Sequence, residues 1–139
     1  MSFFSNLFSK SSFFTSEYTD KTMMSLAEVM NAHANWKLRL NKYVEGTLGY
    51  ALDPEMLAQA NDTELGRWIL QNDSLSMSDE RRELIKRLHD ANSELHQVAS
   101  TIARHVRSGN QAAIAFDNEE LAVASKQVMV ILMELGKSS

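Results

Sequence analysis

The sequence contains no cysteine, a single proline and only five glycines among its 139 residues. Without cysteine the chain can form no disulfide, thiolate zinc site, iron–sulfur cluster or cysteine nucleophile. Any bound metal would therefore need nitrogen and oxygen ligands. The scarcity of proline and glycine, together with eight methionines and many leucines and alanines, favours long helices and argues against an all-β fold.

Basic residues and long apolar runs are also scarce. Fourteen Lys and Arg against eighteen Asp and Glu give a net charge of -4, which argues against nucleic acid as a partner. The sequence has no run of about eighteen apolar residues, so we expect no transmembrane helix. It also has no basic start before an apolar run, so we expect no secretory signal. We therefore expect a cytoplasmic protein with a single core.

The first twenty residues differ in composition from the rest of the chain. Residues 1–20 hold five of the six Phe, many Ser and one Lys, and we interpret them as an N-terminal appendage to a domain spanning residues 21–139. Because flanking basic residues that would attract lipid are missing, disorder or packing against the domain or a dimer mate is favoured over membrane contact. Membrane contact would use four apolar residues at helical spacing, Phe3, Phe4, Leu7 and Phe8.

Apolar residues recur at alternating steps of three and four in the long segments that follow, which predicts amphipathic helices. The first helix is capped by Asp20 or Thr22 and ends at Gly46. A later long helix is capped by Ser78 and ends at Gly109, because Ser favours the N-cap and Gly favours the left-handed conformation after a helix.

The segment between these two helices predicts a pair of short helices. Pro54 suits the first turn of one. The other contains Gly66, which costs about 1 kcal/mol in a helix relative to alanine and marks a close approach of another backbone. A final helix runs from Gln111 to Leu135, with a disturbance at Asp117 and Asn118. Counting the short helices as one crossing, we predict an all-α fold, an antiparallel four-helix bundle.

Two histidines interrupt the apolar stripes of these helices. His33 occupies an inward position of the first helix, and His96 lies beside the stripe of the later long helix, one turn after Asn92. A buried imidazole needs partners for its nitrogens, either hydrogen-bonding groups or a metal such as zinc held between facing helices. We expect His105, in the last turn of its helix, to interact with the terminal carbonyls.

Four runs of the chain resemble, in order and spacing, the chemoreceptor zinc-binding domain: AHANWKLRL from Ala32, LGRWIL from Leu65, LHQVASTI from Leu95 and LAVASKQVMVIL from Leu121. The resemblance covers about residues 25–135. It implies a four-helix bundle that binds zinc through three His and one Cys. Bacterial chemoreceptors and diguanylate cyclases contain this domain as a cytoplasmic, often dimeric, sensory module.

Two of the four ligand positions that this resemblance implies are changed. The first and last family histidines correspond to His33 and His96, whereas Thr63 stands in place of the Cys and Asn92 in place of the remaining His. Hydroxyl and amide oxygens are poorer zinc ligands than thiolate and imidazole, so the site is degenerate and zinc would bind weakly. Asp62 could supply a third ligand, but capping of the following helix is its favoured role. Without metal, the four positions would form a hydrogen-bonded network.

We predict a stand-alone, non-enzymatic bacterial signalling or adaptor protein that acts by protein contact. Its partner would be a second copy, forming a homodimer, or a signalling protein of the chemotaxis or cyclic-di-GMP type. The apolar final helix and the N-terminal segment are candidate contact surfaces. The chain has no Gly-rich phosphate loop, nucleophile elbow or pair of Glu-x-x-His motifs, which argues against an enzyme.

An alternative function is histidine phosphotransfer, with His33 as the phosphoryl acceptor. Such domains also form four-helix bundles. Trp36 and Lys37, however, stand where those domains usually have Lys and Gly. The acceptor must also be exposed, whereas the inward position of His33 predicts burial.

Overall fold

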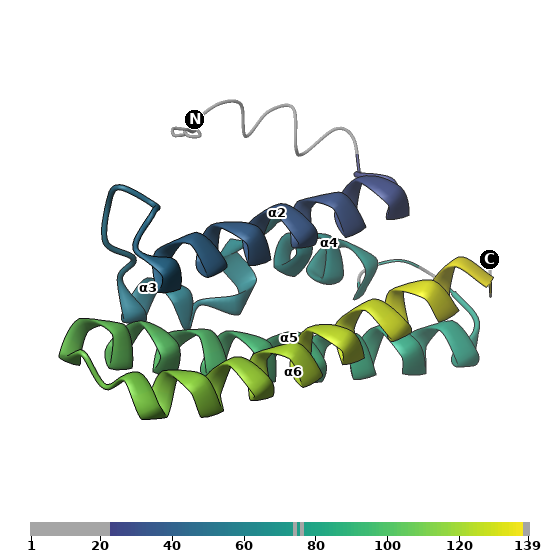
Figure 1. Cartoon of the computed structure of the whole chain (residues 1–139). Coiled ribbons are helices and arrows are strands. Elements are labelled where there is room, and N and C mark those ends of the chain that lie inside the picture. Colours follow the sequence, from purple (N-terminus) through teal and green to yellow (C-terminus); the bar gives the residue numbers. More distant parts are fainter. Residues whose placement is uncertain (1–22, 74, 76, 138–139) are drawn as a thin grey trace.

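The computed structural model describes residues 23–73, 75 and 77–137, and every regular element in these ranges is a helix (Figure 1). The predicted N-terminal appendage, residues 1–20, lies outside the described residues. The all-helical prediction is confirmed. In chain order the elements are α2 (Leu26–Glu45), α3 (Pro54–Leu57), the 3₁₀ helix η1 (Ala60–Asp62), α4 (Glu64–Asp73), α5 (Asp79–Ser108) and α6 (Gln111–Lys137).

Helix α2 begins at a reciprocal cap. Ser25 Oγ accepts a hydrogen bond from the Glu28 N–H at 3.1 Å, and the Glu28 carboxylate accepts one from the Ser25 N–H at 2.8 Å. The predicted cap at Asp20 or Thr22 is therefore wrong, because Ser25 and Glu28 together satisfy two N–H groups that one capping side chain could not. Gly46, at φ 82°, ends the helix in the left-handed conformation.

Helices α5 and α6 lie side by side as an antiparallel pair (Figure 1). Ser78 caps α5 and Gly109, at φ 74°, ends it, as predicted. Arg87 and Glu134 meet at 3.7 Å near the end of the pair that is distant from the connecting turn. Both side chains are about half exposed, so this ion pair contributes little to stability, roughly 0–1 kcal/mol.

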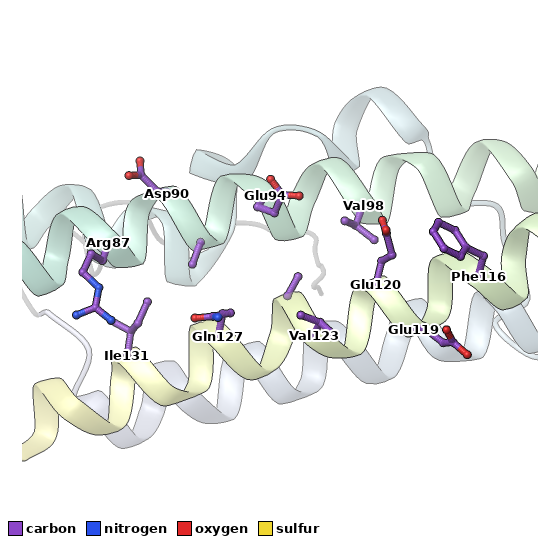
Figure 2. A pocket seen from close by; sticks show the side chains of 12 residues that line it. Arg87, Asp90, Glu94, Val98, Phe116, Glu119, Glu120, Val123, Gln127 and Ile131 are labelled. Atoms are coloured by element: carbon purple, nitrogen blue, oxygen red, sulfur yellow. The ribbon is translucent and has the colours of Figure 1, made fainter.

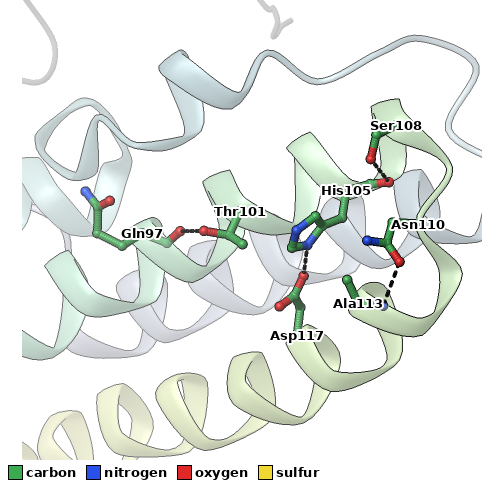
Figure 3. A network of polar contacts seen from close by, with 7 residues as sticks. All are labelled: Gln97, Thr101, His105, Ser108, Asn110, Ala113 and Asp117. Atoms are coloured by element: carbon green, nitrogen blue, oxygen red, sulfur yellow. Dashed lines mark hydrogen bonds and ion pairs between the residues drawn. The ribbon is translucent and has the colours of Figure 1, made fainter.

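A stronger polar contact joins the two helices near the turn (Figure 3). His105 Nδ1 hydrogen-bonds to the carboxylate of the buried Asp117. Helix α6 is continuous through Asp117 and Asn118, so the predicted disturbance is wrong. The predicted contact of the His105 ring with the terminal carbonyls is also wrong, because a carboxylate on the facing helix is a stronger acceptor than a carbonyl.

Helices α2 and α4 pack on one side of the α5–α6 pair (Figure 1). Trp68 Nε1 donates to the Met24 carbonyl at 2.9 Å, which ties α4 to the residues just before α2. In the described ranges no helix combines the length and apolarity needed to span a membrane. The most deeply buried apolar side chains come from all four longer helices and form one core: Val29, Leu40, Ile69, Ile85, Leu88, Leu95, Ile102, Val128, Leu132 and Leu135.

The 3₁₀ helix η1 lies against the first turn of α4, where Gly66 is buried. A Cβ placed on Gly66 would lie 2.0 Å from the Ala60 carbonyl oxygen and 2.8 Å from the Asn61 Cα. No side chain fits at such distances from backbone atoms. The close approach that the sequence predicts at this glycine is confirmed.

Replacing Gly66 with alanine would push η1 away from α4. We expect Gly66→Ala to lower the free energy of unfolding by about 1–3 kcal/mol, although alanine has the higher helix propensity. Urea denaturation followed by circular dichroism measures this change. Gly136→Ala is the matched control, because the nearest atom to its Cβ is the end of the Leu26 side chain at 3.0 Å. Equal losses in both variants would contradict the backbone contact as the cause.

Candidate functional site

His33 lies in the middle of α2 and points into the core. Its side chain is only 4% exposed, and its Nε2 shares a hydrogen bond of 2.9 Å with Ser125 Oγ on α6. This bond joins residues 92 positions apart in the chain. The sequence predicted the burial of His33 and its need for a partner. Ser125 stands beside Lys126 and Gln127 in the last helix, and nothing in that run indicated its role.

Helix α5 presents three buried polar side chains, one turn apart, to the segment that contains α3 and η1. We call these side chains, Asn92, His96 and Ser100, the α5 polar ladder. Each donates a hydrogen bond to one backbone carbonyl of that segment. The bonds are Ser100 Oγ to Pro54 at 2.7 Å, His96 Nδ1 to Leu57 at 2.8 Å and Asn92 Nδ2 to Ala60 at 3.4 Å.

The ladder fixes the tautomer of His96. A carbonyl oxygen can only accept, so the proton of neutral His96 lies on Nδ1, and Nε2 carries the lone pair. The Trp36 indole lies near both histidines, with ring centroids 6.0 Å from His33 and 4.7 Å from His96. We call His33, Trp36 and His96 the His–Trp cluster. It contains both histidines that the sequence singled out.

Both histidines of the cluster are neutral at pH 7. Burial lowers the pKa of His33 from 6.5 to about 4, and the positive charge of Lys37 and the neighbouring His96 act in the same direction. Burial also lowers the pKa of His96, and its hydrogen bond to the Leu57 carbonyl opposes this shift only in part. Neutral imidazoles can pack against the indole and each other without charge repulsion.

Thr63 and Asn92, the two changed positions, converge on one backbone atom. The Thr63 hydroxyl donates to the Ala60 carbonyl at 3.1 Å, and Asn92 donates to the same oxygen. Thr63 Oγ1 also accepts from the Gly66 N–H at 3.0 Å, so Thr63 caps α4. The predicted cap at Asp62 is wrong, because Asp62 belongs to η1 and the next residue provides the capping oxygen.

The predicted network among His33, Thr63, Asn92 and His96 is wrong, because no hydrogen bond between described residues joins any two of them. His33 and His96 bond to Ser125 and a carbonyl rather than to Thr63 or Asn92. Asn92 is 2% exposed, and its Oδ1 accepts no hydrogen bond from any residue that the structure describes. An unsatisfied acceptor of this kind costs about 1–3 kcal/mol, so the fold retains Asn92 at a penalty.

The donors near the cluster fit a zinc ion poorly. Asp62, the predicted third ligand, is exposed, and its backbone carbonyl accepts a hydrogen bond from Arg67 at 2.7 Å. Within residues 23–73, 75 and 77–137, no three His, Cys, Asp or Glu side chains lie together in a way that could hold a metal. Among these residues, His33 and His96 therefore have no third ligand of these types. Two imidazoles alone fall short of the three or four protein ligands of ordinary zinc sites.

These features define an all-helical protein whose core contains two neutral histidines packed against a tryptophan. The chain matches no protein-family model, no curated protein and no solved structure. The resemblance to the chemoreceptor zinc-binding domain therefore stays a prediction from short sequence motifs.

The lowered pKa of His33 predicts how stability depends on pH. The unfolded chain binds a proton at His33 near pH 6.5 and the folded chain only near pH 4, so acid favours unfolding between these values. We expect the free energy of unfolding to fall through this window by up to about 1.4 kcal/mol per pH unit from His33, with His96 adding to the slope. Urea denaturation at a series of pH values measures the slope.

The matched comparison uses His33→Gln, which removes the titrating group but keeps a side chain that can reach Ser125. Its stability should vary less with pH than that of the natural protein. Titration of the His33 ring near pH 6.5, followed by NMR, would contradict burial as the controlling effect.

Proposed function

We propose that this chain is a non-enzymatic signalling or adaptor protein related to the chemoreceptor zinc-binding domain, with an antiparallel four-helix bundle and a degenerate metal site. One observation carries the proposal. Two of the four positions that match the family's ligands, His33 and His96, flank the same indole, and the other two, Thr63 and Asn92, meet at the Ala60 carbonyl.

Output through protein contact is the mode of action that this proposal implies. The histidines are buried, neutral and hydrogen-bonded, which suits a structural role more than acid–base or nucleophilic chemistry. We place the protein in the cytoplasm, where its partner would be a second copy or a bacterial signalling protein of the chemotaxis or cyclic-di-GMP type. Neither nucleic acid nor membrane is a proposed partner.

The position of His33 in the structure does not support histidine phosphotransfer. A phosphoryl acceptor must meet the active site of a partner protein, and His33 is 4% exposed with its Nε2 bonded to Ser125. Finding acid-labile phosphate on His33 after incubation with a phosphorylated response regulator would reverse this ranking.

Zinc content tests the degenerate site. We expect protein purified without chelator to contain much less than one zinc per chain, and His33→Ala to leave that amount unchanged, because two imidazoles without further ligands bind zinc weakly. Elemental analysis by mass spectrometry measures the content. Stoichiometric zinc that is lost in His33→Ala would show a repaired site and contradict this part of the proposal.

The reverse experiment restores the missing ligands. The double variant Thr63→Cys with Asn92→His should bind about one zinc per chain, as a three-His, one-Cys site requires. Adding His33→Ala to the double variant should abolish binding. If the double variant takes up no zinc although circular dichroism shows a folded protein, the resemblance assigns these four positions incorrectly.

Capture from the protein's own cells tests the signalling role. Tagged full-length protein, cross-linked in those cells and purified, should retain a second copy of itself or a protein of the chemotaxis or cyclic-di-GMP type. An unrelated helical protein of similar charge, tagged in the same way, is the control. A strict monomer by sedimentation that retains no such protein above the control would refute the proposed function.

A further inference from the structure

An open groove runs along the face that α5 and α6 turn away from α2 and α4 (Figure 2). Its volume is about 700 Å³. Its apolar lining comes from both helices and consists of Ala91, Val98, Phe116, Val123, Ala124 and Ile131. We call this feature the α5–α6 groove. It does not involve the His–Trp cluster.

Large apolar side chains are exposed along the α6 side of this groove. Phe116 is 61% exposed and Val123 is 65% exposed, and the two stand seven residues apart, on one face of the helix. Val130, a further seven residues along, is also exposed. Apolar side chains that recur with this period beside a groove are typical of a surface that receives another helix.

The edges of the groove are acidic. Asp90 and Glu94 come from α5 and Glu119 from α6, and the Glu120 side chain points from α6 toward α5 (Figure 2). Arg87 is the basic side chain of the lining, and it is engaged by Glu134 at 3.7 Å. In the described part of the chain, Glu94, Glu119 and Glu120 form no ion pair. The groove therefore combines an apolar floor with carboxylates contributed by both helices.

This charge pattern discriminates among the possible occupants. A second copy docked by the same groove would bring carboxylates against carboxylates, and an anionic lipid surface would be repelled. Residues 1–20 supply one lysine, Lys10, against Glu17 and Asp20, so they offer no excess of positive charge. A partner helix with an apolar stripe and basic residues on both sides of it would match both the apolar floor of the groove and its carboxylates.

We propose that the α5–α6 groove binds an amphipathic helix of a partner protein, with apolar residues facing the floor and Lys or Arg on both flanks. The α6 lining from Phe116 to Ile131 spans fifteen residue steps, which at about 1.5 Å each gives roughly 22 Å. The bound helix is therefore about four turns long. This inference rests on the proposed function, because it names the chemistry of the partner through which that function would act.

A designed peptide tests this specificity. The probe is a labelled helical peptide of about eighteen residues with Leu at i, i+3, i+4 and i+7 steps and Lys on both flanks. Its control has the same apolar face with Glu in place of every Lys. We expect the full chain to bind the basic peptide at least about tenfold more tightly in fluorescence anisotropy, and added salt to reduce the preference.

Variants locate the binding surface. Val123→Asp should weaken binding of the basic peptide by at least about tenfold, and Glu119→Lys with Glu120→Lys should shift the preference toward the acidic peptide. Leu38→Asp, at a 52% exposed position of α2 outside the groove, is the matched control and should bind as the natural protein does. Circular dichroism checks that each variant is folded.

Four outcomes would overturn the inference. These are equal binding of both peptides, no binding of either, equal effects of Val123→Asp and Leu38→Asp, and a dimer that Val123→Asp dissociates in sedimentation. The last outcome would assign the groove to a second copy. Capture of a signalling partner that is unaffected by Val123→Asp would leave the proposed function standing while this inference fails. Specific peptide binding without any captured partner would support the chemistry assigned to the groove and count against the proposed function.

Discussion

The arrangement of this protein depends on the α5 polar ladder. The segment with α3 and η1 is short and irregular, and its carbonyl groups would be costly to bury without donors. Ser100, His96 and Asn92 supply those donors at one-turn intervals, each matched to a carbonyl three residues from the next. The ladder therefore holds a segment whose helices are each only about one turn long against α5.

The contacts at Ala60 extend this constraint to α4 and to the histidines. The Ala60 carbonyl accepts from Asn92 and Thr63, and Gly66 leaves room for η1 against the first turn of α4, which Thr63 caps. His96 is likewise committed to the Leu57 carbonyl. Thr63, Asn92 and His96, which occupy the family's ligand positions, are here bonded to the backbone. The tautomer of His96 follows from its bond to the Leu57 carbonyl, whereas its lowered pKa follows from burial.

Much of the fold could be predicted from the sequence because its signals are local. The caps at Ser78 and Gly109 and the close approach at Gly66 each follow from what one residue does to its own backbone. The partners of the buried polar groups could not be predicted in this way. His33 bonds to Ser125 across 92 positions, and the ladder bonds to carbonyls, which every residue has and which carry no signature in the sequence. The pairing of His105 with Asp117 could likewise not be predicted, because it depends on the register between α5 and α6.

Helix α5 uses opposite faces of the same turns for different purposes. Asn92 and His96 hold the α3–η1 segment, while Ala91, Glu94 and Val98 line the groove on the other side. Because the inner face is fixed by hydrogen bonds and by the core, the outer face presents its lining in one arrangement. A preformed lining reduces the conformational entropy that a partner helix must overcome on binding. In the proposed complex, the buried polar groups would thus contribute to recognition indirectly, by fixing the orientation of α5 beside the groove.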